Sequence, residues 1–160
     1  LSMKTTIFLG AMLSLLVCLM FTGCSNSETN STSRGLTDFA HIEEEYLATI
    51  DSLNWPDGIA LPDKLEDEDT GASFQVGYGE TRASYLWEYS WMKEWLDTYN
   101  TDPERAEKAL EELEKAFDMP YMGIDRCDDA TRNYLRENID KAKLGDPFGF
   151  TESIRANYAN

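Results

Sequence analysis

The sequence predicts an all-α protein, a small antiparallel bundle of about four helices followed by a short C-terminal helix. Beyond residue 36, apolar residues recur at three- and four-residue intervals in several segments, which is the spacing of one helix face. Proline and glycine mark turns between these segments. Several of the connections are short, and short connections favour antiparallel neighbours.

The first helix is expected over residues 37–53. Asp38 or Thr37 can cap its N-terminus, and the turn sequence Trp55-Pro56-Asp57-Gly58 ends it. His41, the one histidine of the chain, falls opposite the apolar stripe on a helical wheel and is expected to face solvent. The stripe consists of Phe39, Ile42, Tyr46, Ile50 and Leu53.

A polar loop is expected over residues 59–73, with its acidic part at 63–71. An EF-hand loop starting at Asp67 would need an oxygen ligand at its fifth position and glutamate at its twelfth, but those positions are Gly71 and Tyr78. We therefore expect a solvated acidic loop, with an irregular cation site as the alternative. Alternating apolar residues then predict a short extended segment at Phe74, Val76 and Tyr78.

The second helix, expected over residues 80–100, should lie at the centre of the bundle. Its apolar arc spans roughly 200° of the helical wheel, which is wider than a surface helix shows. So wide an arc needs at least two neighbouring helices to cover it. The arc contains Tyr85, Leu86, Trp87, Tyr89, Trp91, Met92, Trp95, Leu96 and Tyr99.

Three further helices complete the predicted fold. The third begins at Asp102-Pro103-Glu104, where an N-cap precedes a proline at the first helical position, and Met119-Pro120 breaks it. The tight turn before Asp102 makes the second and third helices neighbours. The fourth is expected over residues 127–144, and apolar spacing over 148–158 predicts a short final helix.

The N-terminal segment has the pattern of an export signal. Lys4 provides a positive start, and residues 7–21 are uncharged and apolar but too few to span a membrane comfortably. The segment ends in Phe21-Thr22-Gly23-Cys24, which resembles the lipobox of bacterial lipoproteins, although Phe21 stands where that family usually has an aliphatic residue. The resemblance implies cleavage before Cys24 and attachment of a diacylglyceryl group to its thiol.

The resemblance divides the chain into three parts. These are a lipoprotein signal peptide at 1–23, a lipidated tether at 24–36 and an acidic helical domain at 37–160. The tether is rich in serine, threonine and asparagine, a composition typical of a flexible linker. The protein is therefore expected on the extracytoplasmic face of the cell membrane, with acylated Cys24 inserted in the lipid bilayer.

The net charge limits the partners of the domain. The chain has a formal charge of −16, and removal of the signal peptide takes away Lys4 and no acid, which leaves −17. Such acidity excludes nucleic acid as a partner and gives no electrostatic help in binding an anionic membrane. An envelope protein or a cationic partner fits this charge.

Patterns of catalytic and metal sites are absent from the sequence. Once Cys18 and Cys24 are set aside, His41 and Cys127 alone cannot form a Cys/His zinc site of the usual spacing, and no disulfide can form in the domain. There is no His-Glu-x-x-His, no phosphate-binding glycine loop and no nucleophile elbow. We predict no catalytic residue, metal ligand or cofactor, and interpret Cys127 as a small buried hydrophobe.

The candidate ligand-binding residues lie on the second helix. Trp87 and Trp91 are four residues apart on one edge of the apolar arc, and Glu88 falls inside that arc. Tryptophans beside a carboxylate can stack on a sugar or hold a cation. Trp55, in the turn after the first helix, is a second candidate for contact with a partner.

The favoured interpretation is nevertheless that these aromatic residues form the core, because large aromatic side chains bury much apolar area. In that case Glu88 should pair with an arginine such as Arg132 or Arg136. Trp55 would then close one end of the bundle.

Three functional hypotheses follow. The leading one is a membrane-anchored, non-enzymatic module that binds a partner or an envelope component. The second is an envelope-acting enzyme with a carboxylate-only site near Glu88, which predicts a pocket holding two carboxylates about 5–10 Å apart. The third is a structural or immunity-type surface protein, which predicts no sizeable pocket and an exposed apolar patch.

Overall fold

The computed structural model describes residues 35–66 and 68–158. The predicted signal peptide at 1–23, Cys24 and the tether up to residue 34 lie outside the described residues, as does Asp67 of the acidic loop. Among the helices that the structure does describe, none combines the length and the apolar character needed to cross a membrane.

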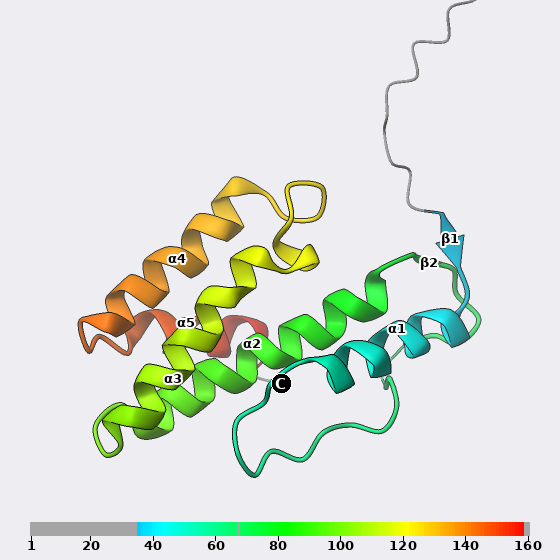
Figure 1. Ribbon diagram of the computed structural model, residues 1–160. Coiled ribbons are helices and arrows are strands. Elements are labelled where there is room, and N and C mark those ends of the chain that lie inside the picture. Colours follow the sequence, from blue (N-terminus) through cyan, green and yellow to red (C-terminus); the bar gives the residue numbers. More distant parts are fainter. Residues whose placement is uncertain (1–34, 67, 159–160) are drawn as a thin grey trace, which may run out of the picture. The chain divides into compact units, whose positions relative to one another are not determined.

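The described chain is built from five α-helices packed against one another, which confirms the all-α fold class (Figure 1). β1 (Leu36–Thr37), before α1, pairs antiparallel with β2 (Phe74–Gln75), before α2, in a minimal two-stranded sheet. Two short 3-10 helices, η1 (Lys115–Asp118) and η2 (Pro120–Met122), connect α3 to α4. The helices are α1 (Phe39–Ser52), α2 (Tyr78–Thr98), α3 (Pro103–Glu114), α4 (Asp129–Lys143) and α5 (Phe148–Asn157).

Aspartates cap three of the helices, and two of these caps, Asp38 and Asp102, are the ones that the sequence predicts. The carboxylates of Asp38, Asp102 and Asp128 each accept a hydrogen bond from the backbone N–H three residues later, at 3.1, 3.2 and 2.7 Å. Such a bond satisfies one of the free donors in the first turn of a helix. These caps place the starts of α1, α3 and α4 within two residues of the expected positions.

The start of α2 is capped from another helix. Gly77 precedes this helix with φ +89° and has no side chain to act as a cap. Glu45 of α1 takes that role, because its Oε1 accepts from the backbone N–H of Gly77 at 2.7 Å and its Oε2 from that of Gly79 at 3.1 Å. The carboxylate therefore joins α1 to the positive end of the α2 dipole.

Helices α1 and α2 run in the same direction, which departs from the antiparallel arrangement expected throughout (Figure 1). Glu45 reaches the beginning of α2 at Gly79, whereas the carbonyl of Asn54, just after α1, accepts from the indole N–H groups of Trp87 and Trp91. The long connection over residues 53–77 makes this possible, because it returns the chain to the start of α1. Antiparallel packing does follow where the connection is a tight turn, between α2 and α3.

Helix α2 lies at the centre of the bundle, as its wide apolar arc predicts. It packs against α1, α3 and α5, and its aromatic residues take part in the larger of two buried clusters. The smaller cluster lies mainly between α1 and α2 and includes Ile42, Tyr46 and Ile50. At Gly79 the two helices touch so closely that a Cβ would lie 1.8 Å from the carbonyl oxygen of Ile42.

Some element boundaries differ from the expectation. Leu36, assigned to the tether, pairs in β1 with Gln75, and the extended segment covers Phe74–Gln75 because Tyr78 already begins α2. The third helix leaves α-geometry at Glu114 and continues in tighter 3-10 turns up to Pro120. Proline lacks a backbone N–H, so it stops the α-helical hydrogen-bond pattern before it.

Candidate functional site

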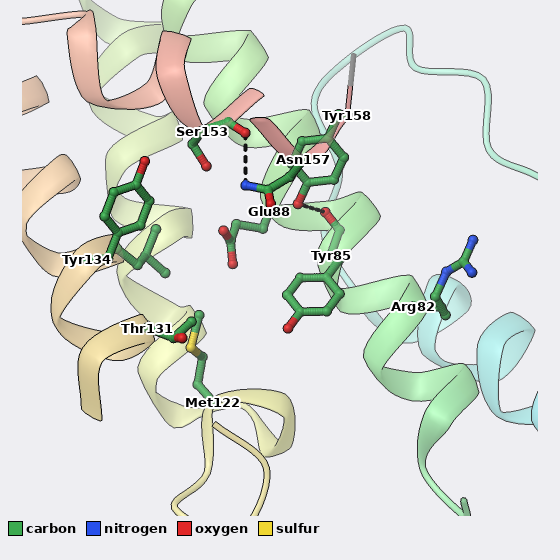
Figure 2. Close-up of a pocket in the computed structure, with 10 residues that line it drawn as sticks. Arg82, Tyr85, Glu88, Met122, Thr131, Tyr134, Ser153, Asn157 and Tyr158 are labelled. Atoms are coloured by element: carbon green, nitrogen blue, oxygen red, sulfur yellow. Dashed lines mark hydrogen bonds between the residues drawn. The ribbon is translucent and has the colours of Figure 1, made fainter. Parts of the chain in front are cut away.

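A cavity of about 570 Å³ lies on the side of α2 that faces η2, α4 and α5 (Figure 2). This size is within the range of small-molecule sites. The lining combines tyrosines, apolar side chains and a few polar groups. The lining residues are Arg82, Tyr85, Glu88, Met122, Thr131, Tyr134, Leu135, Ser153, Asn157 and Tyr158.

Glu88 lies at the inner end of this cavity. It comes from the middle of α2 and is 7% exposed. The phenol of Tyr121, from η2, donates a hydrogen bond of 2.7 Å to Oε2 of Glu88. Among the described residues no donor lies within hydrogen-bonding distance of Oε1, so this oxygen remains available to a ligand. Figure 2 shows the carboxylate directed into the space between Tyr134 and Tyr85.

Glu88 does not pair with either arginine that the core interpretation named. Arg132 instead contacts Asp129 and the backbone carbonyl of Cys127, and Arg136 lies over the ring of Phe117, 4.5 Å from its centroid. Arg132 therefore binds groups at the start of α4, and Arg136 packs on an aromatic ring of η1. Within the described parts of the chain, no lysine, arginine or histidine forms an ion pair with Glu88.

Burial raises the pKa of the Glu88 carboxyl to about 7, and the hydrogen bond from Tyr121 limits the rise. Desolvation disfavours the charged form of a carboxyl, whereas a donor to that form favours it. The cavity therefore contains a carboxyl whose pKa lies in the neutral range, so that both its protonated and its ionised forms occur there. It can accept a hydrogen bond from a ligand in one state and donate one in the other.

Tyrosines form much of the cavity wall around Glu88. Burial raises the pKa values of Tyr85, Tyr121 and Tyr158, and the negative charge of Glu88 raises all three further. Tyr85 and Tyr121 meet edge to face with centroids 5.5 Å apart. The phenol of Tyr158 donates to the backbone carbonyl of Tyr85 at 3.2 Å, which holds the end of α5 against α2 (Figure 2). Tyr134 closes the side formed by α4.

Arg82 lies at the outer end of the cavity and is not the counter-ion of Glu88. Its guanidinium forms an ion pair with Glu68 from the loop between α1 and α2. The phenol of Tyr78 donates to the same carboxylate at 2.8 Å. In Figure 2 the Arg82 guanidinium points away from Glu88.

The predicted tryptophans belong to the core rather than to the cavity wall. Trp87 and Trp91 are each 1% exposed, and their indole N–H groups share the carbonyl of Asn54 at 2.8 and 3.1 Å. Trp55 is half-buried, donates to the carbonyl of Ile50 at 2.9 Å and packs against both apolar clusters. Of the four residues proposed for ligand binding on α2 and in the turn after α1, only Glu88 lines this cavity.

The sequence interpretation missed the tyrosines. Tyr85 precedes Glu88 by three residues and so shares its helix face, and this spacing in the sequence could have identified Tyr85 as a neighbour of Glu88. Tyr134 of α4 is 47% exposed and borders the cavity. Tyr121 and Tyr158 come from distant segments, and nothing in the sequence around Glu88 indicates that they reach it.

His41 and Cys127, the other two residues considered for chemistry, lie away from the lining of this cavity. His41 is exposed, as predicted, and its Nε2 lies 3.3 Å from Oε1 of Glu45. Cys127 is partly buried, and burial raises the pKa of its thiol. Across residues 35–66 and 68–158, no group of three His, Cys, Asp or Glu side chains is placed to hold a metal ion.

Comparison of the chain with models of protein families, with curated proteins and with solved structures found no match in any of the three. The functional argument therefore rests on the geometry around Glu88.

Proposed function

We propose that this protein is a lipid-anchored binding protein of the bacterial envelope, and that it holds a small ligand in the cavity at Glu88. One observation carries the proposal. A carboxylate that is 7% exposed, with one oxygen unbonded and no cationic partner in the described chain, opens into a cavity of about 570 Å³.

A buried carboxyl without a cationic partner is costly to a fold. Burying a charged group disfavours the folded state unless the charge is paired or the group takes up a proton. An apolar residue at position 88 would pack against Met122 and Leu135 without that cost. A perturbed ionisable group in a cavity is therefore a candidate binding group.

The anchor is proposed from the sequence. The lipobox-like ending at Cys24 and the polar tether support a position of the domain close to the extracytoplasmic surface of the membrane. The acidic domain provides no basic surface to assist, so acyl chains on Cys24 must account for membrane attachment.

The two alternatives fit the cavity less well. An enzyme with a pair of carboxylates needs a second acid, but within the described residues Glu88 is the one carboxylate among those that line the cavity. A purely structural or immunity-type protein predicts no sizeable pocket. A binding module therefore has the stronger support.

A ligand screen with a cavity-filling variant tests the proposal. Thr131 lines the cavity from the exposed face of α4, so Thr131→Trp should fill the space at little cost to folding. Asn133→Trp, also exposed on α4 but outside the lining, is the matched control. The full-length protein in detergent is screened by thermal unfolding against cationic, neutral and anionic organic molecules.

The expected result is a set of compounds that raise the Tm of the wild type and of Asn133→Trp but not that of Thr131→Trp, because a ligand that binds the folded state stabilises it. The binding proposal is wrong if no compound distinguishes the wild type from Thr131→Trp.

A further inference from the structure

We infer that the ligand of the cavity is a positively charged organic amine whose ammonium group donates a hydrogen bond to Oε1 of Glu88. This inference rests on the proposed binding function and specifies the chemical class of the ligand. It is carried by the absence of a counter-charge for Glu88 in the described chain and by the aromatic wall around it.

The first observation behind the amine assignment is that Glu88 has no counter-charge in the described chain. Arg82, the arginine that lines the cavity, is paired with Glu68. Arg132 is paired with Asp129, and Arg126 forms an ion pair of 2.6 Å with Glu80. A protonated amine would supply the positive charge that Glu88 lacks. Its N–H would also satisfy Oε1, while Tyr121 continues to donate to Oε2.

The second observation is that aromatic rings line the cavity around Glu88. Rings of Tyr85, Tyr134 and Tyr158 border the space into which the carboxylate points (Figure 2). A cation near the face of an aromatic ring is attracted by its quadrupole, and a carboxylate with aromatic neighbours is a common way to bind organic ammonium groups. Met122 and Leu135 add apolar surface suited to the hydrocarbon part of such a ligand.

Other ligand classes are less well matched. An anion would be repelled by ionised Glu88, and Arg82 is not free to receive it. A neutral polyol would leave the ionised carboxylate without a counter-charge. A bare divalent metal ion is bound best by several anionic oxygen ligands, whereas Glu88 is the single carboxylate among the described residues that line the cavity.

Proton linkage gives the inference a distinctive signature. The ionisable groups around Glu88 have raised pKa values, so they stay neutral while Glu88 titrates; these are Tyr85 on α2, Tyr121 on η2, Tyr158 after α5 and the thiol of Cys127 before α4. Tyr134 faces the site from α4, and Arg82 remains paired with Glu68. An ammonium ligand favours the carboxylate, so its affinity must rise as Glu88 loses its proton.

The test is calorimetry on the full-length protein in detergent with matched probes. Butylammonium, hexylammonium and 2-phenylethylammonium are compared with butan-1-ol, hexan-1-ol and 2-phenylethanol at pH 6 and pH 8. At least one amine should bind ten or more times as tightly as its alcohol. Its affinity should increase about tenfold from pH 6 to pH 8, the change in the ionised fraction of a carboxyl with a pKa of about 7.

Variants locate the interaction. Glu88→Gln keeps the shape of the side chain and an acceptor for Tyr121, so it should lose at least tenfold in amine affinity and the pH dependence with it. Glu111→Gln, an exposed change on α3, should leave the affinity unchanged. The wild-type pH profile needs no variant and tests the inference even if Glu88→Gln fails to fold.

The outcomes separate the two proposals. If no amine binds more tightly than its alcohol, or if affinity falls from pH 6 to pH 8, the amine assignment is wrong. The binding function then still stands if other compounds in the screen distinguish the wild type from Thr131→Trp. If no compound does so, the binding function itself is wrong.

Discussion

The phenol of Tyr121 donates a hydrogen bond of 2.7 Å to Oε2 of Glu88, and this is the one polar contact that the described residues make with that carboxylate. It joins η2 to the middle of α2 across the buried end of the cavity. Because it stabilises the charged form, it sets a limit to the effect of burial on Glu88.

Removal of this donor should raise the pKa of Glu88 further. Tyr121→Phe keeps the ring in the core but removes the hydroxyl, so the carboxylate loses its remaining stabilising contact. The stability cost at pH 8 should be about 1–3 kcal/mol, because a buried charged acceptor is left unsatisfied. Carbon-13 NMR of labelled glutamate measures the pKa, and Tyr89→Phe, which removes a phenol not bonded to Glu88, is the control. An unchanged pKa in Tyr121→Phe would contradict the assignment.

Glu88 should also make stability depend on pH in a defined direction. Its pKa is raised from 4.5 to about 7 on folding, so between these values the folded protein retains a proton that the unfolded chain has released. Stability must therefore fall as pH rises from about 4.5 to 7. Glu88→Gln abolishes this loss, and its stability relative to the wild type should be higher at pH 8 than at pH 4.5 by about 3 kcal/mol. Urea unfolding at both pH values measures the difference, and an equal difference at both would refute the prediction.

The cap that Glu45 provides for α2 should contribute measurably to stability. Glu45→Ala leaves the N–H groups of Gly77 and Gly79 without their acceptor, which should cost about 1–2 kcal/mol. The adjacent Glu44 is exposed, and Glu44→Ala should change stability by less than about 0.5 kcal/mol. Chemical denaturation compares the two variants, and equal effects would show that the cap is unimportant.

The proposed lipid anchor predicts acylation of Cys24 and not of Cys127. Cells that express the full chain should incorporate labelled palmitate into the wild type and into Cys127→Ser, but not into Cys24→Ser. The reason is that the lipobox-like sequence precedes Cys24, whereas Cys127 lies within the folded domain. Labelling that persists in Cys24→Ser would exclude this cysteine as the acylation site.

Local chemistry made much of the fold predictable. Asp38 and Asp102 are read directly from the sequence as caps, because each bonds to a backbone group three residues away. The central position of α2 also follows from its own apolar arc. These features depend on neighbours along the chain and not on the tertiary arrangement.

The cavity could not be predicted in the same way. The apolar arc of α2 contains both Trp87, which is 1% exposed in the core, and Tyr85, which is 40% exposed at the cavity, and nothing local distinguishes them. The partner of Glu88 proved to be a phenol from η2 rather than an arginine from α4, a choice set by how the segments dock. The parallel course of α1 and α2 likewise depends on the path of the 53–77 connection.

The position of α5 in the chain determines when, during synthesis, the cavity is complete. Ser153, Asn157 and Tyr158 form one wall of the cavity. Because synthesis runs from the N-terminus, the ribosome makes these residues after all the others that line it. The helices that precede α5 can begin to pack before it exists, but the cavity cannot be complete. The proposed capture of a ligand would therefore require α5, and a bound ligand should in turn slow amide hydrogen exchange in α5 more than in α3.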